Sequence, residues 1–365
     1  MNQLEKILKL YDYYLPPKLI AQSPAKPRDS ARLLVFRKRD GKISFDRFSN
    51  IARHLPKNAV LVFNQTKVWP ARLIVKKSTG GKVELLYISH DKNYIRVLAD
   101  RKLPINSKAT FLRGRVKTSY DFFTVIKKSG QFYFLKPSFP LSQMPSVLRQ
   151  YGITPLPPYI KNSPLTEIQR REQYQSVFAK TGLSVAAPTA SLHFTKELIK
   201  RLQKQGIGTA FVQLDVNLGT FAPLKEEQIK SGKLHREFYN IDKATAKFLN
   251  QAKKEGRPII AVGTTVVRTL ESASALHQSG TLSLSKGSKN QRLTKLKGNT
   301  GLFIKENYDL KFVDGLITNF HVPKSSLLML TSAFVGRKKL FDLYQRAIKK
   351  NFRFFSFGDG MLILP

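Results

Sequence analysis

The chain has 365 residues and no cysteine, and its 63 Lys and Arg against 24 Asp and Glu give a formal net charge of +39. The length allows a sizeable core and two or three domains, and the missing cysteines exclude disulfides, thiolate zinc sites and a cysteine nucleophile. This excess of positive charge predicts a polyanionic partner, nucleic acid ahead of an anionic membrane surface, although a general preference for lysine is an alternative.

The first 70 residues predict the start of an α/β domain. A short helix ends at Leu10, a two-stranded hairpin turns at Asp40-Gly41, and the continuous apolar run at 59–63 is typical of a buried strand. That strand leads directly into the polar residues Asn64 and Thr66. Because α/β proteins bind ligands at the carboxyl ends of their strands, we expect these two side chains to face a ligand.

The pattern changes between residue 71 and about residue 139. Short β-rich runs recur there, one of them at 116–120, with turns such as Thr79-Gly80-Gly81 between them and no convincing helix. Closely spaced strands of this kind are typical of a small antiparallel barrel. We therefore expect residues 71–140 to form a β-barrel domain inserted into an α/β domain made of residues 1–70 and 141–365.

Residues 184–195 carry no formal charge and lead into a predicted helix at 196–205. Thr195 is a good N-cap for that helix, and Gly206 is a plausible terminator. The stretch therefore brings His193 to the positive end of a helix, which suits a carboxylate or another electron-rich group. A packed histidine in a buried connection is an equally good interpretation of these residues alone.

A second apolar strand, predicted at 259–262, also ends in polar side chains. It opens onto Thr264, Thr265 and Arg268, and we expect Thr265 to cap a helix that runs through residue 275. Threonines at such a position bind ligand hydroxyls in some proteins and only cap helices in others.

A third such segment, at 315–319, ends at Asn319 and is followed by His321. Three polar clusters come before it in the chain: Asn64 with Thr66, the stretch leading to His193, and Thr264 to Arg268. Asn319 and His321 make a fourth, and we expect the four clusters to share one pocket. Residues 280–301 are rich in Ser, Lys, Gly and Asn without a clear period, which predicts a flexible basic loop.

Several functional classes are excluded by missing motifs. The sequence has no Walker-type phosphate loop, no zincin motif and no nucleophile elbow, and Gly206-Ile207-Gly208 lacks the third glycine of a dinucleotide loop. The histidines show no metal-ligand spacing, so we expect no metal site. No long apolar run and no signal peptide are present, so we expect a cytoplasmic protein that does not enter a membrane.

The polar clusters also carry a resemblance to a known family. The most specific matches are residues 184–195, Val262-Gly263-Thr264-Thr265 with 268–272, residues 317–321, and Arg353-Phe354-Phe355-Ser356 with Gly358-Asp359. Weaker matches are Tyr11-Asp12-Tyr13, residues 62–64, Pro70-Ala71-Arg72-Leu73 and residues 155–160. On these residues the chain resembles the S-adenosylmethionine:tRNA ribosyltransferase-isomerases of queuosine biosynthesis over nearly its whole length.

The resemblance implies an α/β domain with an inserted β-barrel, in agreement with the strand spacing. It also implies that the ribosyl group of S-adenosylmethionine is transferred to 7-aminomethyl-7-deazaguanine at the tRNA wobble position and isomerised. The products would be epoxyqueuosine-tRNA, adenine and methionine. S-adenosylmethionine is then a substrate, no metal is needed, and the partner is a tRNA that carries a queuosine precursor in its anticodon. We expect a monomer.

Such a reaction needs a base near the sulfonium, a hydrogen-bond donor for the departing adenine, and groups that hold the ribose hydroxyls and the methionine carboxylate. Within the matched motifs, the resemblance gives as candidate catalytic residues His193, His321, Asp12, Glu237 and Asp359, and as candidate substrate-binding residues Asn64, Thr66, Arg72, Thr195, Thr264, Thr265, Arg268 and Asn319. A purely structural hydrogen bond is the alternative at each position.

The sequence departs from the family pattern at a few positions. Leu183 and Ser191 stand where glycine is usual, Asp215 stands for a histidine, and Asn217 stands for a glycine. A tRNA-binding paralogue with impaired catalysis is therefore an alternative hypothesis. An RNA methyltransferase that uses the same substrate is disfavoured, because the glycine-rich loop of that class is missing.

Overall fold

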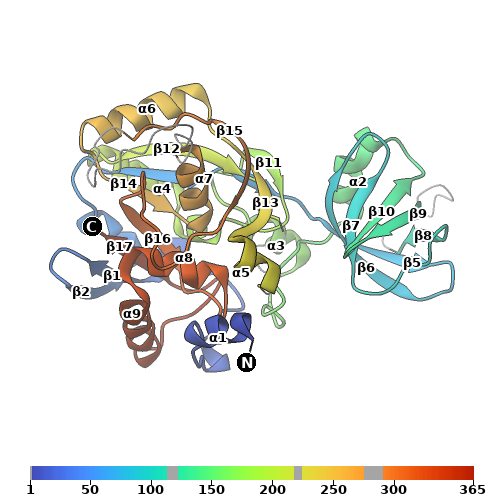
Figure 1. Cartoon of the computed structure of the whole chain (residues 1–365), viewed down its shortest axis with the longest axis horizontal. Coiled ribbons are helices and arrows are strands. Elements are labelled where there is room, and N and C mark those ends of the chain that lie inside the picture. Colours follow the sequence, from blue (N-terminus) through green and yellow to red (C-terminus); the bar gives the residue numbers. More distant parts are fainter. Residues whose placement is uncertain (1, 113–121, 218–223, 275–290) are drawn as a thin grey trace.

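The computed structural model describes residues 2–112, 122–217, 224–274 and 291–365. A large mixed sheet with its helices lies beside a smaller closed barrel, which stands to one side of it (Figure 1). The predicted fold class, an α/β domain with an inserted antiparallel β-barrel, is confirmed. The residue limits of the two domains remain a prediction.

The sheet has nine strands, and its centre is parallel. Across the sheet the strands are β15 (Lys297–Leu302), β13 (Lys233–Asn240), β12 (Gly208–Leu214), β3 (Val60–Asn64), β14 (Ile259–Val262), β16 (Gly315–Asn319), β17 (Gly360–Leu364), β1 (Arg32–Arg37) and β2 (Ile43–Arg47). Strands β12, β3, β14 and β16 pair in parallel. Their carboxyl ends therefore meet at one edge, where a ligand site is expected.

Both faces of the sheet are covered, which explains the continuous apolar runs. In β3, Val60 and Val62 belong to one hydrophobic cluster, and Leu61 and Phe63 belong to another on the opposite face. The first cluster includes helices α6 (Lys243–Lys254), α7 (Thr264–Ser274), α8 (Ser326–Val335) and α9 (Arg337–Lys349). The second includes α4 (Lys196–Lys204) and the 3-10 helix η3 (Phe48–Arg53). Fully buried parallel strands have no polar face, so they show no alternation.

Three shorter helices complete the domain: α1 (Gln3–Leu10), α3 (Glu167–Gln173) and α5 (Glu226–Ser231). Ile229 of α5 belongs to the first cluster, and Leu4 and Ile7 of α1 pack against it. The predicted caps of α4 are confirmed, because the Thr195 hydroxyl accepts a hydrogen bond from the Leu198 N–H, and Gly206 takes a left-handed conformation. No helix in the described ranges is long and apolar enough to cross a membrane.

The barrel is closed by six antiparallel strands. In order around it they are β10 (Phe132–Pro137), β7 (Ile95–Ala99), β6 (Lys82–His90), β5 (Arg72–Lys77), β8 (Lys108–Phe111) and β9 (Phe122–Ser129). Helix α2 (Met144–Tyr151) packs its buried side chains into the barrel cluster. The strand expected at 116–120 lies outside the described residues.

The chain enters and leaves the barrel at one place. The Arg72 N–H donates to the Ile153 carbonyl at 3.2 Å, and the Ile153 N–H donates to the Arg72 carbonyl at 2.7 Å. Gly152 is needed at this neck, because a Cβ there would lie 1.8 Å from the Pro70 carbonyl oxygen. The two connections are therefore held side by side.

Two predicted elements differ from the structure. Helix α7 begins at Thr264, so Thr265 lies inside its first turn and does not cap it from outside. The last part of the expected basic loop is strand β15, because residues 297–302 pair with β13. Strand β13 itself carries the charged residues Arg236 and Glu237, which hide its alternation in the sequence.

Candidate functional site

A hollow lies at the carboxyl edge of the parallel strands. The segments that follow β14 and β16 meet there with the connection that precedes α4 and with the segment before β17. The lining residues are Tyr159, residues 187–190, Val216, Gly263, Thr264, Thr265, residues 318–322, Leu327, Phe355 and Ser356. Three of the four predicted polar clusters therefore share one pocket.

The described residues that line this hollow include no Asp, Glu, Lys or Arg. The lining offers threonine and serine hydroxyls, one amide, one imidazole and the rings of Tyr159, Phe320 and Phe355. Such a lining suits a neutral ligand with hydroxyl groups and an aromatic base. Phosphate is a poor fit, because none of the described lining residues is a cation that could pair with it.

Thr265 provides independent evidence for a polar ligand. Its hydroxyl oxygen is buried and has no hydrogen-bond partner among the described residues, although the residue lines the hollow. Gly263, with a φ of +95°, makes the turn from β14 into α7 and keeps the backbone close to this hydroxyl. Buried hydroxyls are normally paired, so an unpaired one in a residue that lines a hollow is consistent with a ligand that completes the bond.

A second group of polar contacts extends from the hollow to His193. Asn319 accepts a hydrogen bond from the Thr189 hydroxyl at 2.8 Å, and its amide nitrogen lies 3.2 Å from Nε2 of His193. The imidazole stacks on Phe48, with ring centroids 4.7 Å apart. Burial, with help from the charges of Arg353 and Arg28, lowers the pKa of His193 from 6.5 to about 3. The ring is therefore neutral at neutral pH and holds the Asn319 amide.

His321 lines the hollow directly. Its Nε2 lies 2.8 Å from the Thr318 hydroxyl, and its backbone N–H donates to the Tyr344 hydroxyl. Burial lowers the pKa of His321 from 6.5 to about 3, so this ring is also neutral at neutral pH.

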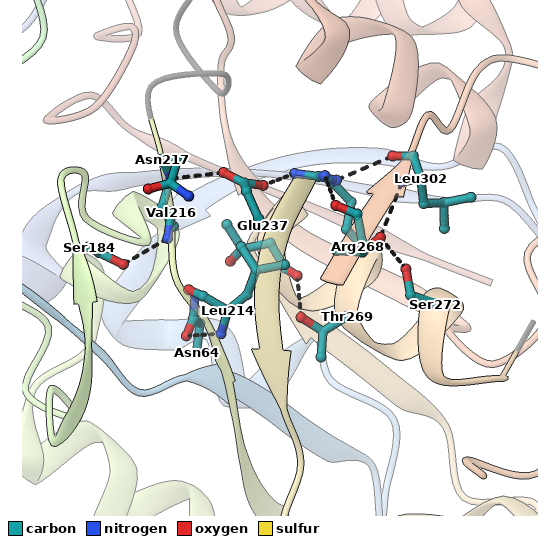
Figure 2. A network of polar contacts seen from close by, with 12 residues as sticks. Asn64, Ser184, Leu214, Val216, Asn217, Glu237, Arg268, Thr269, Ser272 and Leu302 are labelled. Atoms are coloured by element: carbon teal, nitrogen blue, oxygen red, sulfur yellow. Dashed lines mark hydrogen bonds and ion pairs between the residues drawn. The ribbon is translucent and has the colours of Figure 1, made fainter. Parts of the chain in front are cut away.

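A smaller hollow lies next to the first, and Leu327 lines both. It contains the buried ion pair between Glu237 of β13 and Arg268 of α7 (Figure 2). The other Glu237 oxygen accepts the Asn217 N–H at 2.9 Å, and Arg268 also donates to the Leu302 carbonyl at 3.3 Å. A cation and an anion thus stand together beside the uncharged hollow.

The fourth predicted cluster turns away from the hollow. The Asn64 amide binds both backbone groups of Leu214, at 3.0 and 3.1 Å. The Thr66 hydroxyl contacts the Ser184 hydroxyl at 2.7 Å and donates to Asp215 at 3.1 Å. These contacts tie β3, β4 (Thr66–Val68), β11 (Thr181–Ser184) and β12 together.

The remaining candidates also lie outside the lining of the hollow. Asp359 accepts the backbone N–H groups of Arg32 and Arg353, and Asp12 forms an exposed ion pair with Lys324 at 2.9 Å. Thr195 caps α4, as described above. Arg72 starts the barrel and pairs with Glu84 at 3.0 Å.

The structure adds lining residues that were not among the candidates. The Tyr159 hydroxyl lies 2.6 Å from the Ser356 hydroxyl, and burial raises the pKa of Tyr159 to about 12. Phe355 has a φ of +70°, a rare conformation for a residue with a side chain. These residues stand in the matched segments 155–160 and 353–356, and that match was the only signal for them in the sequence.

An uncharged hollow that is lined by apolar residues and a few hydroxyl, amide and imidazole groups, at the carboxyl edge of a parallel sheet, is typical of an enzyme that binds a small organic ligand. Comparison with known proteins defines the family. The model of the queuosine biosynthesis protein family matches residues 8–363, and the chain belongs to that family.

Individual relatives agree with this assignment over their whole length. The chain is 43% identical to the S-adenosylmethionine:tRNA ribosyltransferase-isomerase of Carboxydothermus hydrogenoformans, over 98% of this chain and 99% of the relative. It is 40% identical to the protein of the same name from Fusobacterium nucleatum, over 99% and 98%. The crystal structure of the S-adenosylmethionine tRNA ribosyltransferase from Thermotoga maritima aligns with a TM-score of 0.54 at 30% identity, covering 97% of this chain and all of that one. The family predicted from the sequence is confirmed.

Proposed function

We propose that this protein is an S-adenosylmethionine:tRNA ribosyltransferase-isomerase. It transfers and isomerises the ribosyl group of S-adenosylmethionine onto 7-aminomethyl-7-deazaguanine at the tRNA wobble position, and it releases adenine and methionine. The observation that carries the proposal is the uncharged hollow with its unpaired Thr265 hydroxyl, in a chain whose whole length matches this family.

The ribose and adenine of S-adenosylmethionine fit the uncharged hollow. Ribose hydroxyls would find partners in Thr264, Thr265 and the Asn319 amide, which His193 and Thr189 hold in place. The aromatic rings of the lining offer stacking surface to the adenine and an electron-rich face to the sulfonium.

The methionine end fits the second hollow. Its ammonium and carboxylate need an anion and a cation close together, and Glu237 and Arg268 supply them within one pair. Leu327 lines both hollows, so the proposal requires a single extended ligand to pass beside this side chain.

Proton transfer is assigned to the hollow. His321 and Tyr159 are the titratable side chains among its described lining residues. His321 is neutral at neutral pH and so keeps one ring lone pair that can accept a proton, whereas Tyr159 keeps its proton and donates. We assign His321 as the candidate base and Tyr159 as a candidate donor to the departing adenine. His193 is a positioning residue in this scheme.

The experiment incubates the protein with S-adenosylmethionine and an anticodon stem-loop RNA that carries the deazaguanine. Mass spectrometry should find the epoxide nucleoside in the RNA, and chromatography should find one free adenine for each nucleoside formed. RNA binding without adenine release would contradict the proposal and favour the impaired paralogue. A methylated RNA would favour a methyltransferase.

One observation bears on the impaired paralogue. Asp215 accepts hydrogen bonds from the Thr66 hydroxyl, the Leu183 N–H and the Gln213 amide, at 3.1, 3.3 and 2.9 Å. It therefore acts within the contact between β12 and β11, outside the lining of the hollow. The departure from the family at this position supports a change in local structure more than a loss of the ligand site.

The macromolecular partner in this proposal is a tRNA that carries a queuosine precursor, which is supported by the family and by the net charge of +39. We further propose that the protein works as a monomer in the cytoplasm. Light scattering at micromolar concentration tests the oligomeric state, and cell fractionation tests the location.

A further inference from the structure

The outer surface of the barrel carries a group of basic and aromatic side chains that the proposed reaction does not use. Strands β7, β10, β9 and β8 are neighbours around the barrel. They contain no Asp or Glu within their bounds. Four cationic side chains stand at their outward positions: Arg96, Lys108, Lys127 and Lys136. Three phenylalanines, Phe122, Phe132 and Phe134, also stand at outward positions. We call these seven residues the barrel face.

The barrel face is one continuous surface. Phe134 lies directly opposite Arg96 of β7 on one side and opposite Lys127 of β9 on the other. In the next row, Lys136 lies opposite Thr124, which lies opposite Lys108 of β8. In the first row a ring therefore lies between two cations, and in the second row two cations lie on either side of Thr124.

The three rings are not needed for the core of the barrel. The inward positions of the same strands are filled by buried residues such as Phe123, Val125 and Leu135. The rings of the barrel face are only half-buried, and within the described residues they neither belong to the barrel cluster nor pack against it. Their apolar surface is thus left to solvent and to the cations beside them.

Each ring has a cation over its face. The guanidinium of Arg96 lies 5.0 Å from the centre of the Phe132 ring, Lys127 lies 4.9 Å from Phe134, and Lys108 lies 4.6 Å from Phe122. Edge protection does not explain these lysines, because a closed barrel has no free edge. Rings interleaved with cations are typical of surfaces that bind unpaired nucleotides, where bases stack on the rings and phosphates pair with the cations.

We propose that the barrel face binds unpaired nucleotides of the tRNA substrate outside the reacting nucleotide. The identity of that RNA as tRNA rests on the proposed function. The barrel stands to one side of the sheet that carries the hollow (Figure 1), so the two domains contact different parts of one long RNA.

The test uses the full chain and a labelled tRNA transcript. The variant Phe132→Leu with Phe134→Leu keeps apolar volume but removes the stacking faces, and it should weaken RNA binding by roughly 5- to 100-fold. The variant with Tyr at both positions keeps the rings and should bind like the wild type. A second variant, Lys127→Gln with Lys136→Gln, should lower the slope of log affinity against log salt by about 2. Its matched control is Lys247→Gln with Lys254→Gln on α6, which should change the affinity much less.

Ultraviolet crosslinking of the wild-type complex gives a readout that does not depend on any variant folding. Crosslinked peptides should contain residues 132–136. The proposal is overturned if the Leu pair binds RNA as the wild type does, if the two lysine pairs weaken binding equally, or if no crosslink falls in β9 or β10. Failure of this proposal can be distinguished from failure of the proposed function. If no adenine is released, the proposed function fails, but the crosslinks still show whether the barrel face binds RNA.

Discussion

The buried histidines His193 and His321 predict that the protein loses stability as the pH falls below about 6.5, well above the pH at which carboxylates are protonated. The change that tests this is His193→Gln. Glutamine keeps an acceptor for the Asn319 amide, which lies 3.2 Å from Nε2 of His193, but it cannot be protonated in this pH range.

The magnitude follows from the lowered pKa. His193 has a pKa of about 3 in the folded protein and 6.5 when unfolded. Between these values the unfolded chain binds the proton and the folded chain does not, so stability is complete above pH 6.5 and is lost as the pH falls toward 3. A pH of about 5 lies roughly 1.5 units below the pKa of the unfolded chain, so protonation of the unfolded chain lowers the stability there by about 2 kcal/mol. His321 adds a similar amount, because burial lowers its pKa equally.

The assay is urea unfolding at about pH 8 and about pH 5. We expect the free energy of unfolding of the wild type to fall between these two values, and the fall in His193→Gln to be about 2 kcal/mol smaller. His90→Gln is the matched control, because His90 is exposed, and it should show the same fall as the wild type. If His193→Gln and the wild type lose equal stability, the histidine is not buried as a neutral ring.

Three further substitutions test the site. Thr265→Val removes an unpaired buried hydroxyl, so we expect unfolding free energy to stay equal or rise by about 1 kcal/mol, while KM for S-adenosylmethionine rises about fivefold; an unchanged KM would show that no ligand uses the hydroxyl. Glu237→Gln leaves the Arg268 charge buried without its carboxylate, so urea unfolding should show a loss of about 3 kcal/mol, and a loss below about 1 kcal/mol would contradict the buried pair. Asp215→Asn keeps an acceptor oxygen for Thr66, so adenine release should stay within about twofold. A much larger loss would place Asp215 in the reaction.

Much of the fold was predictable because its signals are local. The all-apolar run of β3 and the alternation of the barrel strands each show in a few consecutive residues, since burial on two faces or on one face sets the pattern directly. The cap at Thr195 is equally local. Strand β13 was missed because its solvent-facing and ion-paired charges interrupt the alternation.

The site was predicted less completely, because its contacts are long-range. Sequence patterns placed Thr264, Thr265, Asn319 and His321 at strand ends, and parallel pairing brings those ends together. No local pattern shows that Asn64 turns to Leu214 instead, because that choice depends on a strand 150 residues away in the chain. The pairing of Glu237 with Arg268 and the contact of Tyr159 with Ser356 have the same origin.

The position of the barrel within the chain has a consequence for synthesis. Strand β3 ends at residue 64, but its two neighbours in the sheet begin only at residues 208 and 259. All six barrel strands are complete by residue 137. On the ribosome the barrel can therefore close while the central strand of the sheet is still without partners, and the later domain must form around a segment that emerged first. During that interval the apolar run at 60–63 is a site where a chaperone would bind.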